Sequence, residues 1–586
     1  MGLFTSEMAD IPLTKVQVSA KIIHFVADVE VQLSYLNDFG EPIEAVFKFE
    51  HLNAALSNFE VEVKGKKHVG ICKEKNEALQ DYDDAIASGK GAYMIEDVRY
   101  GQFMVSVGNL PPDSECRLSF RYVVALTVEE DLIKFSLPIT STPIHKIDNT
   151  SYGVSILVDV LTHTEIEKIS CSHPVDIKKE GNKALVACKS LLRKEFDLSV
   201  HIQDLHEPVH FVELFSKGEA SEEAPFYIPA IPASSPIDKA ESVPPASLIT
   251  FIPKIQTEDE IYSEIIFLVD RSGSMAGAKM NQAKNALQLF LRSLPQNSLL
   301  NIVSFGSTYS SLWKQSLTLT SETLEQATQH VAEMKADMGG TELLAPIKNI
   351  LNQFRIFKEK DFETYQNFPK QIFCLTDGEV SNTNEILSYL KRNIGDARLF
   401  TFGIGAEASK ELVSGMAKFG KGKAEYVKTS ERIESKVIKQ LRKALLPILK
   451  NIKVNWNGLE SAEFSTITKH YPPIFDGERI LIFCNLSEDE NVEGKQITIT
   501  GTTGKQIHEW QLPRSDKHVI QGTTIHRLSA MSYILELQRN AKKNKEKIVQ
   551  LGTDWGLVTK YTSYIAIEDR DIATYASMKT INIQQV

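Results

Sequence analysis

Residues that could bind a metal ion follow an apolar run within Phe267–Met275 (FLVDRSGSM). Asp270, Ser272 and Ser274 recur at every second position directly after the apolar residues end. One carboxylate and two hydroxyls offer only oxygen ligands, which hard cations such as Mg²⁺ and Mn²⁺ prefer. A phosphate-binding turn or a plain polar turn would fit the same residues, so the rest of the chain has to distinguish these alternatives.

The residues around this turn predict a doubly wound α/β domain. A continuous apolar strand at 265–270 is followed by a helix at 279–294, where apolar residues recur at helical spacing, and by a second strand at 298–305. Further strands are expected at 371–376 and 398–403, each after a helix-like segment. In sheets of this class, ligands bind at the carboxyl ends of the strands.

Two more polar clusters fall at that edge of the predicted sheet. Thr341 lies in the glycine-flanked loop Met338–Glu342, before a helix expected at 343–354, and Asp377 follows the strand QIFCLT. With the first turn, these clusters bring two carboxylates and three hydroxyls together. Mg²⁺ or Mn²⁺ that keeps some of its waters is the expected guest.

The three motifs D-x-S-x-S, G-G-T and T-D-G resemble, in order, the metal-ion-dependent adhesion site of the von Willebrand factor type A domain. The resemblance implies that five residues are the metal ligands: Asp270, Ser272, Ser274, Thr341 and Asp377. It also implies that an Asp or Glu carboxylate from a protein partner fills the open coordination position. Such a site serves recognition rather than catalysis.

An enzymatic interpretation lacks a base. Hydrolysis by a metal-bound water needs a group that takes up the proton, and no histidine accompanies the motifs. The GxxxxGK[ST] phosphate loop is absent as well. Phosphoryl transfer through an aspartyl intermediate would leave Ser274 and Thr341 unexplained. We therefore expect a protein that is not an enzyme, with a folded but vestigial metal site as the remaining alternative.

The N-terminal part is expected to form an antiparallel β-sandwich. Apolar residues alternate at 16–22 and 29–35, which predicts half-buried strands, and a helix is expected at 74–86 with Gly89 at its C-cap. The order of these elements and the turn Asn109–Asp113 (NLPPD) resemble the vault protein inter-alpha-trypsin (VIT) domain. That resemblance implies a sandwich carrying one helix, without a known catalytic role.

The whole arrangement resembles the inter-alpha-trypsin inhibitor heavy chains, as an intracellular type, and predicts a multidomain α+β protein. The strands on both sides of the α/β domain would fold together into one hybrid-like β-sandwich. The expected segments are the VIT sandwich at 1–140, the first part of the hybrid-like domain at 141–215, a Pro/Ser/Glu-rich linker at 216–250, the von Willebrand factor type A domain at 251–447, the second hybrid-like part at 448–524, and a C-terminal helix and tail at 525–586.

Charge and composition exclude other classes of function. The net charge of −11, without a basic cluster, argues against a nucleic-acid partner. No apolar run is long enough for a transmembrane segment. Six scattered cysteines without CxxC spacing fit reduced thiols in the cytoplasm. His201, His206 and His210 lie close together in the sequence, but without a cysteine or an HExxH helix they do not predict zinc.

The N-terminus Met1–Ser6 (MGLFTS) fits the pattern for N-myristoylation, which would place a lipid on Gly2. An arbitrary N-terminus is the simpler interpretation. A single myristoyl chain would give only weak peripheral membrane attachment, and no adjacent cysteine offers a second acyl chain.

Together these features predict a non-enzymatic, cytoplasmic scaffold for divalent-cation-dependent protein–protein interaction. A second hypothesis is a structural component of a large intracellular assembly, which docks by its β-sandwich faces while the metal site is vestigial. The two hypotheses differ in whether binding depends on the metal.

Overall fold

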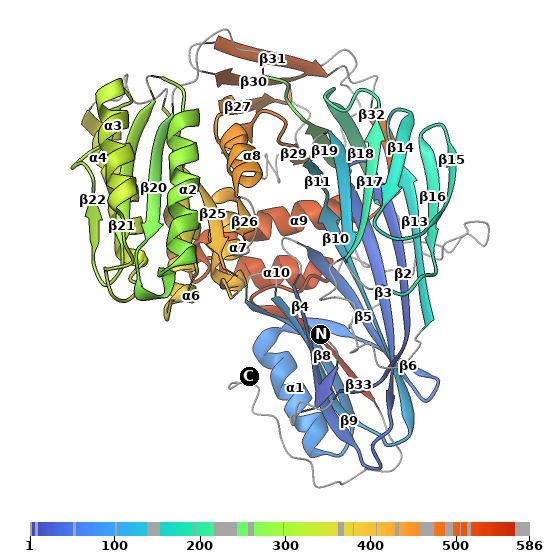
Figure 1. Cartoon of the computed structure of the whole chain (residues 1–586). Coiled ribbons are helices and arrows are strands. Elements are labelled where there is room, and N and C mark those ends of the chain that lie inside the picture. The colour runs from blue at the N-terminus through green and yellow to red at the C-terminus, as the bar shows by residue number, and fades with distance from the viewer. Residues whose placement is uncertain are drawn as a thin grey trace.

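The computed structural model combines a long β region with an α/β domain, and two C-terminal helices lie between them in the view of Figure 1. Within residues 3–568, the structure describes all positions except 6–9, 51–53, 100–101, 130, 138–152, 193–194, 216–242, 256–262, 297, 361–367, 379, 406, 428–432, 458–470, 472–473, 487–495, 504–505 and 513–516. Gly2 and the expected linker at 216–250, apart from its last eight residues, therefore lie outside the described residues.

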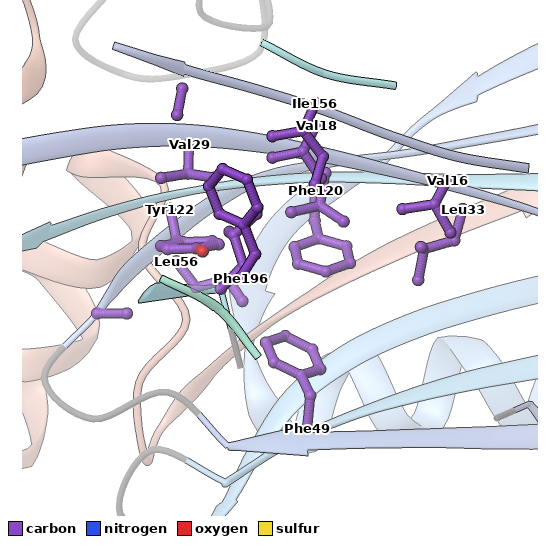
Figure 2. Packing of buried hydrophobic residues seen from close by; sticks show 14 of the residues in the cluster. Val16, Val18, Val29, Leu33, Phe49, Leu56, Phe120, Tyr122, Ile156 and Phe196 are labelled. Atoms are coloured by element: carbon purple, nitrogen blue, oxygen red, sulfur yellow. The ribbon is translucent and has the colours of Figure 1, made fainter. Parts of the chain in front are cut away.

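Two large sheets pack face to face in the N-terminal part. The ring of Phe49, from one sheet, stacks 4.9 Å from the ring of Phe120, from the other (Figure 2). The eight-stranded sheet runs in the order β15 (Asp176–Glu180), β16 (Lys183–Cys188), β13 (Gly153–Leu161), β2 (Leu13–Ile23), β3 (Val26–Asn37), β10 (Ser114–Ala125), β5 (Ala55–Val63), β6 (Lys66–Val69). The six-stranded sheet runs β1 (Phe4–Thr5), β4 (Ile43–Glu50), β9 (Gln102–Leu110), β8 (Gly91–Arg99), β33 (Thr562–Glu568), β7 (Ile71–Glu74).

Helix α1 (Lys75–Ala87) covers the six-stranded sheet through Ala78, Tyr82 and Ala85. A smaller sheet of four strands adds its apolar side chains to the same sandwich core. Its order is β11 (Thr127–Glu129), β12 (Leu132–Leu137), β17 (Phe196–Ile202), β14 (Ile166–Cys171).

The strands β13 and β16 differ from the division that the sequence predicts. They were expected in the hybrid-like domain, but β13 pairs in parallel with β2, and β16 continues the same sheet. Their side chains, such as Val158 and Val186, are fully buried in the N-terminal core. An alternating pattern predicts a half-buried strand, but it does not predict which sheet the strand joins. The strand β33, in the segment expected as a tail, likewise lies between β8 and β7.

A second sandwich combines strands from both sides of the α/β domain. One of its sheets runs β29 (Ile480–Asn485), β19 (Ala246–Phe251), β18 (Val209–Phe215), β32 (Lys517–Gly522). The other runs β28 (Ile474–Phe475), β27 (Ile448–Asn455), β30 (Ile497–Thr503), β31 (Gln506–Leu512). Phe251, Ile482, Leu449 and Ile499 share the core between the two sheets.

Helix α9 (Thr524–Leu537) is the central connection of the β region. Its Ile525, Leu528 and Met531 pack with Val123 of β10 and Phe211 of β18, so the helix joins the two sandwiches. Helix α10 (Lys545–Trp555) adds Ile548 and Leu551 to the same cluster.

The α/β domain has a largely parallel sheet with helices on both faces. The sheet runs β22 (Tyr309–Ser311), β21 (Leu299–Phe305), β20 (Glu264–Asp270), β24 (Lys370–Thr376), β25 (Arg398–Ile404), β26 (Lys421–Val427), with β23 (Leu317–Thr318) beside β21. One face carries α2 (Ala278–Ser293), α3 (Ser321–Glu333) and α8 (Glu434–Ala444). The other carries α4 (Leu344–Lys360), α6 (Thr383–Asn393) and α7 (Lys410–Phe419).

Candidate metal centre

The central strand β20 delivers Asp270 to the carboxyl edge of the sheet. All seven of its residues are buried, because Phe267 and Val269 face one helical layer and Ile266 and Leu268 face the other. The strand lies between β21 and β24, which is the place where the strand order reverses. Ligands of doubly wound sheets bind outside the carboxyl ends of the strands at such a point.

The turn after β20 brings three predicted ligands together. Asp270 is fully buried, and its Oδ1 accepts a hydrogen bond of 2.9 Å from the backbone N–H of Ser272. The hydroxyl oxygens of Ser272 and Ser274 lie 3.1 Å apart. Ser272 is buried, whereas Ser274 is partly exposed. The carboxylate and both hydroxyls therefore form one cluster of oxygen atoms, of which the Ser274 side is partly exposed.

Asp377, directly after β24, is the second buried carboxylate, with 1% exposure. Thr376 connects the two acidic loops, because its hydroxyl donates to Oδ2 of Asp270 at 2.6 Å and accepts from the N–H of Gly378 at 2.9 Å. The Nζ of Lys279 donates to Oδ2 of Asp377 at 2.9 Å. Asp270 and Asp377 are thus held in neighbouring loops at one sheet edge.

The loop that carries Thr341 is fastened to the serine turn. The N–H of Gly273 donates to the carbonyl of Gly339 at 2.8 Å, and the N–H of Met338 donates to the carbonyl of Arg271 at 3.0 Å. Thr341 follows Gly339 by two positions and is partly exposed. These backbone contacts bring its loop to the same edge of the sheet.

The turn after β21 holds this loop from the other side. The N–H of Ser307 donates to the carbonyl of Met338 at 2.6 Å, and the hydroxyl of Ser307 accepts from the N–H of Gly340 at 2.8 Å. A side chain at position 306 would collide with Met338, because a Cβ there would lie 2.3 Å from its carbonyl oxygen. Gly306 therefore permits the close approach that places the loop.

The electrostatics of the cluster favour a cation. Burial raises the pKa of Asp270, and the negative charge of Asp377 acts in the same direction. The hydrogen bonds from Ser272 and Thr376 oppose this effect by stabilising the ionised form. A positive ion beside the two buried carboxylates would relieve the same unfavourable charge, so the oxygen-only donor set fits Mg²⁺ or Mn²⁺.

Three contributors at this edge were not predicted from the sequence. Thr376 orients Asp270, Ser307 fastens the loop of Thr341, and Lys279 pairs with Asp377. Thr376 and Ser307 lie at or just after strand ends, so the rule for doubly wound sheets could have identified them. Lys279 lies on a helix, and no spacing rule connects it to a strand-terminal carboxylate.

The three neighbouring histidines have separate partners. His201 pairs with Glu167 at 2.7 Å, His206 lies 3.3 Å from Asp131, and the Nε2 of His210 lies 2.8 Å from the hydroxyl of Ser247. Among the residues that the structure describes, no three His, Cys, Asp or Glu side chains gather into a potential metal site. The candidate centre differs from such a group because three of its five predicted ligands are hydroxyls.

Comparisons with known proteins define the class. Residues 13–122 match the vault protein inter-alpha-trypsin domain, and residues 263–426 match the von Willebrand factor type A domain. One segment of the chain thus matches a VIT domain, and a second segment matches a von Willebrand factor type A domain.

Several relatives that match most of the chain carry the same domain in their names. Two von Willebrand factor A domain-containing proteins of Dictyostelium discoideum are 32% and 34% identical, over 94% of this chain and over 60% and 56% of their own lengths. The human von Willebrand factor A domain-containing protein 5A is 28% identical, over 97% of this chain and 75% of its own length. The chain thus spans a little over half the length of the Dictyostelium relatives.

In the part of the chain that the structure describes, no helix is both long and apolar enough to span a membrane.

Proposed function

We propose that the protein is a non-enzymatic scaffold that binds protein partners in a manner that depends on a divalent cation. The observation that supports this proposal is the cluster of side-chain oxygen atoms at the point where the strand order reverses, with Asp270 and Asp377 in adjacent loops. The von Willebrand factor type A domain in which the cluster lies supports the same conclusion.

The expected ligands are of two kinds, charged carboxylates and neutral hydroxyls. Asp270 and Asp377 would supply negative charge, while three neutral hydroxyls, those of Ser272, Ser274 and Thr341, would complete the inner face. A Mg²⁺ or Mn²⁺ ion held by this set would remain electrophilic toward a further oxygen ligand. We infer that an Asp or Glu carboxylate of the partner takes that position.

The surrounding residues keep the ligands in place before a partner arrives. The hydroxyl of Thr376 holds the carboxylate of Asp270 by a hydrogen bond. The contact between Gly273 and Gly339 holds the serine turn against the loop that carries Thr341. Such preorganisation reduces the ordering that binding would otherwise require. No step of this function needs a proton acceptor, in agreement with the lack of a histidine in the three motifs.

The proposal includes a cellular setting. The six cysteines all lie among the described residues, and none of them forms a disulfide there, which supports a reducing, cytoplasmic environment. Weak peripheral attachment through Gly2 is compatible with the scaffold function, and intact-mass measurement of the protein from its native cell would reveal a myristoyl group.

Metal binding and partner capture, measured on the full chain, test the proposal together. Titration with Mn²⁺ should show one site in the wild type, weakened at least tenfold in Asp270→Asn. Proteins captured from a native lysate in Mg²⁺ should be lost in EDTA and with Asp377→Ala. Asp176→Asn, an exposed carboxylate of β15, is the matched control and should behave like the wild type.

Two results would contradict the mechanism. One is a wild-type protein that binds no Mn²⁺ at millimolar concentration. The other is a set of partners retained equally in Mg²⁺, in EDTA and with Asp377→Ala. The second result would favour docking by the β-sandwich faces in a large assembly, with a vestigial metal site.

A further inference from the structure

A lysine side chain already lies beside one of the two carboxylates of the candidate centre. Lys279, in the first turn of α2, places its Nζ 2.9 Å from Oδ2 of Asp377. The Asp377 side chain is 1% exposed, whereas that of Lys279 is 23% exposed. The ammonium group of Lys279 thus contacts an oxygen of Asp377 that a metal ion at this site would need as a ligand.

The helix itself does not explain this lysine. The first turn of an α-helix bears the positive end of the helix dipole, so a cation there is unfavourable. Lys279 is the second residue of α2. Its location is therefore explained by the carboxylate that it contacts rather than by the stability of the helix.

The backbone next to Lys279 leaves space for its side chain. The stem of Lys279 passes the end of β25, where a Cβ at Gly405 would lie only 2.9 Å from its Cε. Gly405 has a φ of +101°, which side chains other than that of glycine rarely permit. The glycine leaves room for the lysine to reach Asp377.

We propose that Lys279 is an internal competitor of the metal ion, and that its ammonium group must leave Oδ2 of Asp377 before this oxygen can bind the cation. This inference rests on the proposed function, because it assumes that Asp377 is a metal ligand. Lysine suits this role because its flexible stem and partial exposure allow the charged end to move into water. The ion pair then stabilises the metal-free centre. Because the ion has to displace the ammonium group, the pair also raises the Kd for the metal ion.

The charges of the two carboxylates explain why a single lysine does not replace the metal. Lys279 contacts Asp377, whereas Asp270 is held by neutral donors, the N–H of Ser272 and the hydroxyl of Thr376. One monovalent cation therefore compensates half of the buried negative charge. A divalent ion between the two loops would compensate both carboxylates.

Mn²⁺ titration of full-length variants tests the proposal. Lys279→Met keeps most of the stem but removes the charge, and it should lower the Kd for Mn²⁺ by about tenfold, the effect of losing one charge-assisted contact. In EDTA, Lys279→Met should melt at a lower temperature than the wild type. Saturating Mn²⁺ should raise the melting temperature of the variant by more than it raises that of the wild type.

The matched control lies one and a half turns further along the same helix. Lys284 donates to the backbone carbonyls of Ala332 and Met334, away from the carboxylates. Lys284→Met should therefore leave the Kd for Mn²⁺ unchanged. Lys279→Gln is the second variant and replaces Lys279→Met if circular dichroism shows that the latter is misfolded.

The outcomes separate this inference from the proposed function. A wild type and a Lys279→Met variant with equal Kd, or a variant that binds more weakly, would overturn the competition while leaving the metal site intact. Absence of Mn²⁺ binding in both proteins would overturn the proposed function and this inference with it.

Discussion

The guanidinium carbon of Arg398 lies 3.7 Å from the ring centre of Phe475, and this contact joins the α/β domain to the second sandwich. The same side chain donates to three oxygen atoms. Its Nη2 donates to Glu478 at 2.8 Å, its Nη1 to the carbonyl of Lys443 at 3.0 Å, and its Nε to the carbonyl of Lys421 at 2.9 Å. Because Lys443 belongs to the last turn of α8, one residue fastens that helix to the neighbouring domain.

Replacing Arg398 by lysine should loosen this junction. Lysine keeps the charge but has neither the planar stacking surface nor the fork of donors, so most of these contacts should be lost. We expect a local stability loss of about 2 kcal/mol and faster hydrogen exchange around Lys443. Arg392→Lys is the control, since the exposed Arg392 donates within its own helix, to the carbonyl of Ser388. Unchanged exchange at the end of α8 would refute the role of Arg398.

Glu213 should be essential for the start of α9. Its buried carboxylate accepts from the N–H of Thr524 at 2.8 Å, and from the N–H and ring Nδ1 of His526 at 2.9 and 2.8 Å. Glu213→Ala would leave these donors buried without an acceptor, at a cost of roughly 3 kcal/mol or more. In thermal denaturation, the melting temperature should fall clearly for Glu213→Ala. It should stay unchanged for Glu207→Ala, which truncates an exposed carboxylate. Equal melting temperatures would contradict the assignment.

A pair of histidines should make the β region sensitive to acid. His24, at φ +52° in the turn between β2 and β3, has its Nδ1 3.3 Å from Nδ1 of His163. Burial lowers the pKa of His24 well below its ordinary value and that of His163 to about 4, and the charges of the nearby His518 act in the same direction on both.

The sign of this effect follows from proton binding. Unfolded histidines take up protons near pH 6.5, whereas the folded pair does so only at lower pH, so stability should fall as the pH drops from about 6.5 toward 4. Melting temperatures at pH 7.5 and 5.0 should differ less in a double variant, His24→Asn with His163→Gln, than in the wild type. Asparagine tolerates the positive φ of position 24. His201→Gln, a change at a partly exposed histidine, should show the same fall in melting temperature as the wild type. An undiminished fall in the double variant would exclude the pair of His24 and His163 as its source.

Thr320 should stabilise the first turn of α3. Its hydroxyl accepts from the N–H of Thr323 at 3.3 Å, and the hydroxyl of Thr323 accepts from the N–H of Thr320 at 2.8 Å. Thr320→Ala should cost about 1 kcal/mol and speed hydrogen exchange in that turn. Ser321→Ala, an exposed change at the next position, should leave the exchange almost unaltered. Equal exchange in the two variants would argue against the cap.

The elements of the α/β domain could be predicted closely from the sequence. Helical spacing predicted a helix at 279–294, and α2 spans Ala278–Ser293. Apolar runs that end in polar residues predicted the strands β20 and β24, because the central positions of a strand that is buried on both faces are mostly apolar. The structure places Asp270 and Asp377 at the same edge, while their role as metal ligands stays a prediction.

Contacts between distant segments could not be predicted in the same way. The alternation in β13 indicates one buried face, and that face fits either sandwich, so its pairing with β2 depends on the whole assembled core. The contact between Lys279 and Asp377 is similar, because a lysine in the first turn of a helix ordinarily extends into water. Both features follow from three-dimensional neighbours that local patterns do not encode.

The pairing of β33 has a consequence for the order of folding during synthesis. In the six-stranded sheet, β33 lies between β8 and β7, and its Tyr564 is paired with both Ile95 and Cys72. A ribosome produces β7 and β8 long before β33, so the nascent N-terminal sheet has an open slot between two strands while the α/β domain emerges. Unpaired strand edges attract other chains. The nascent protein would therefore depend on rapid completion, or on a chaperone that shields this slot, until β33 arrives.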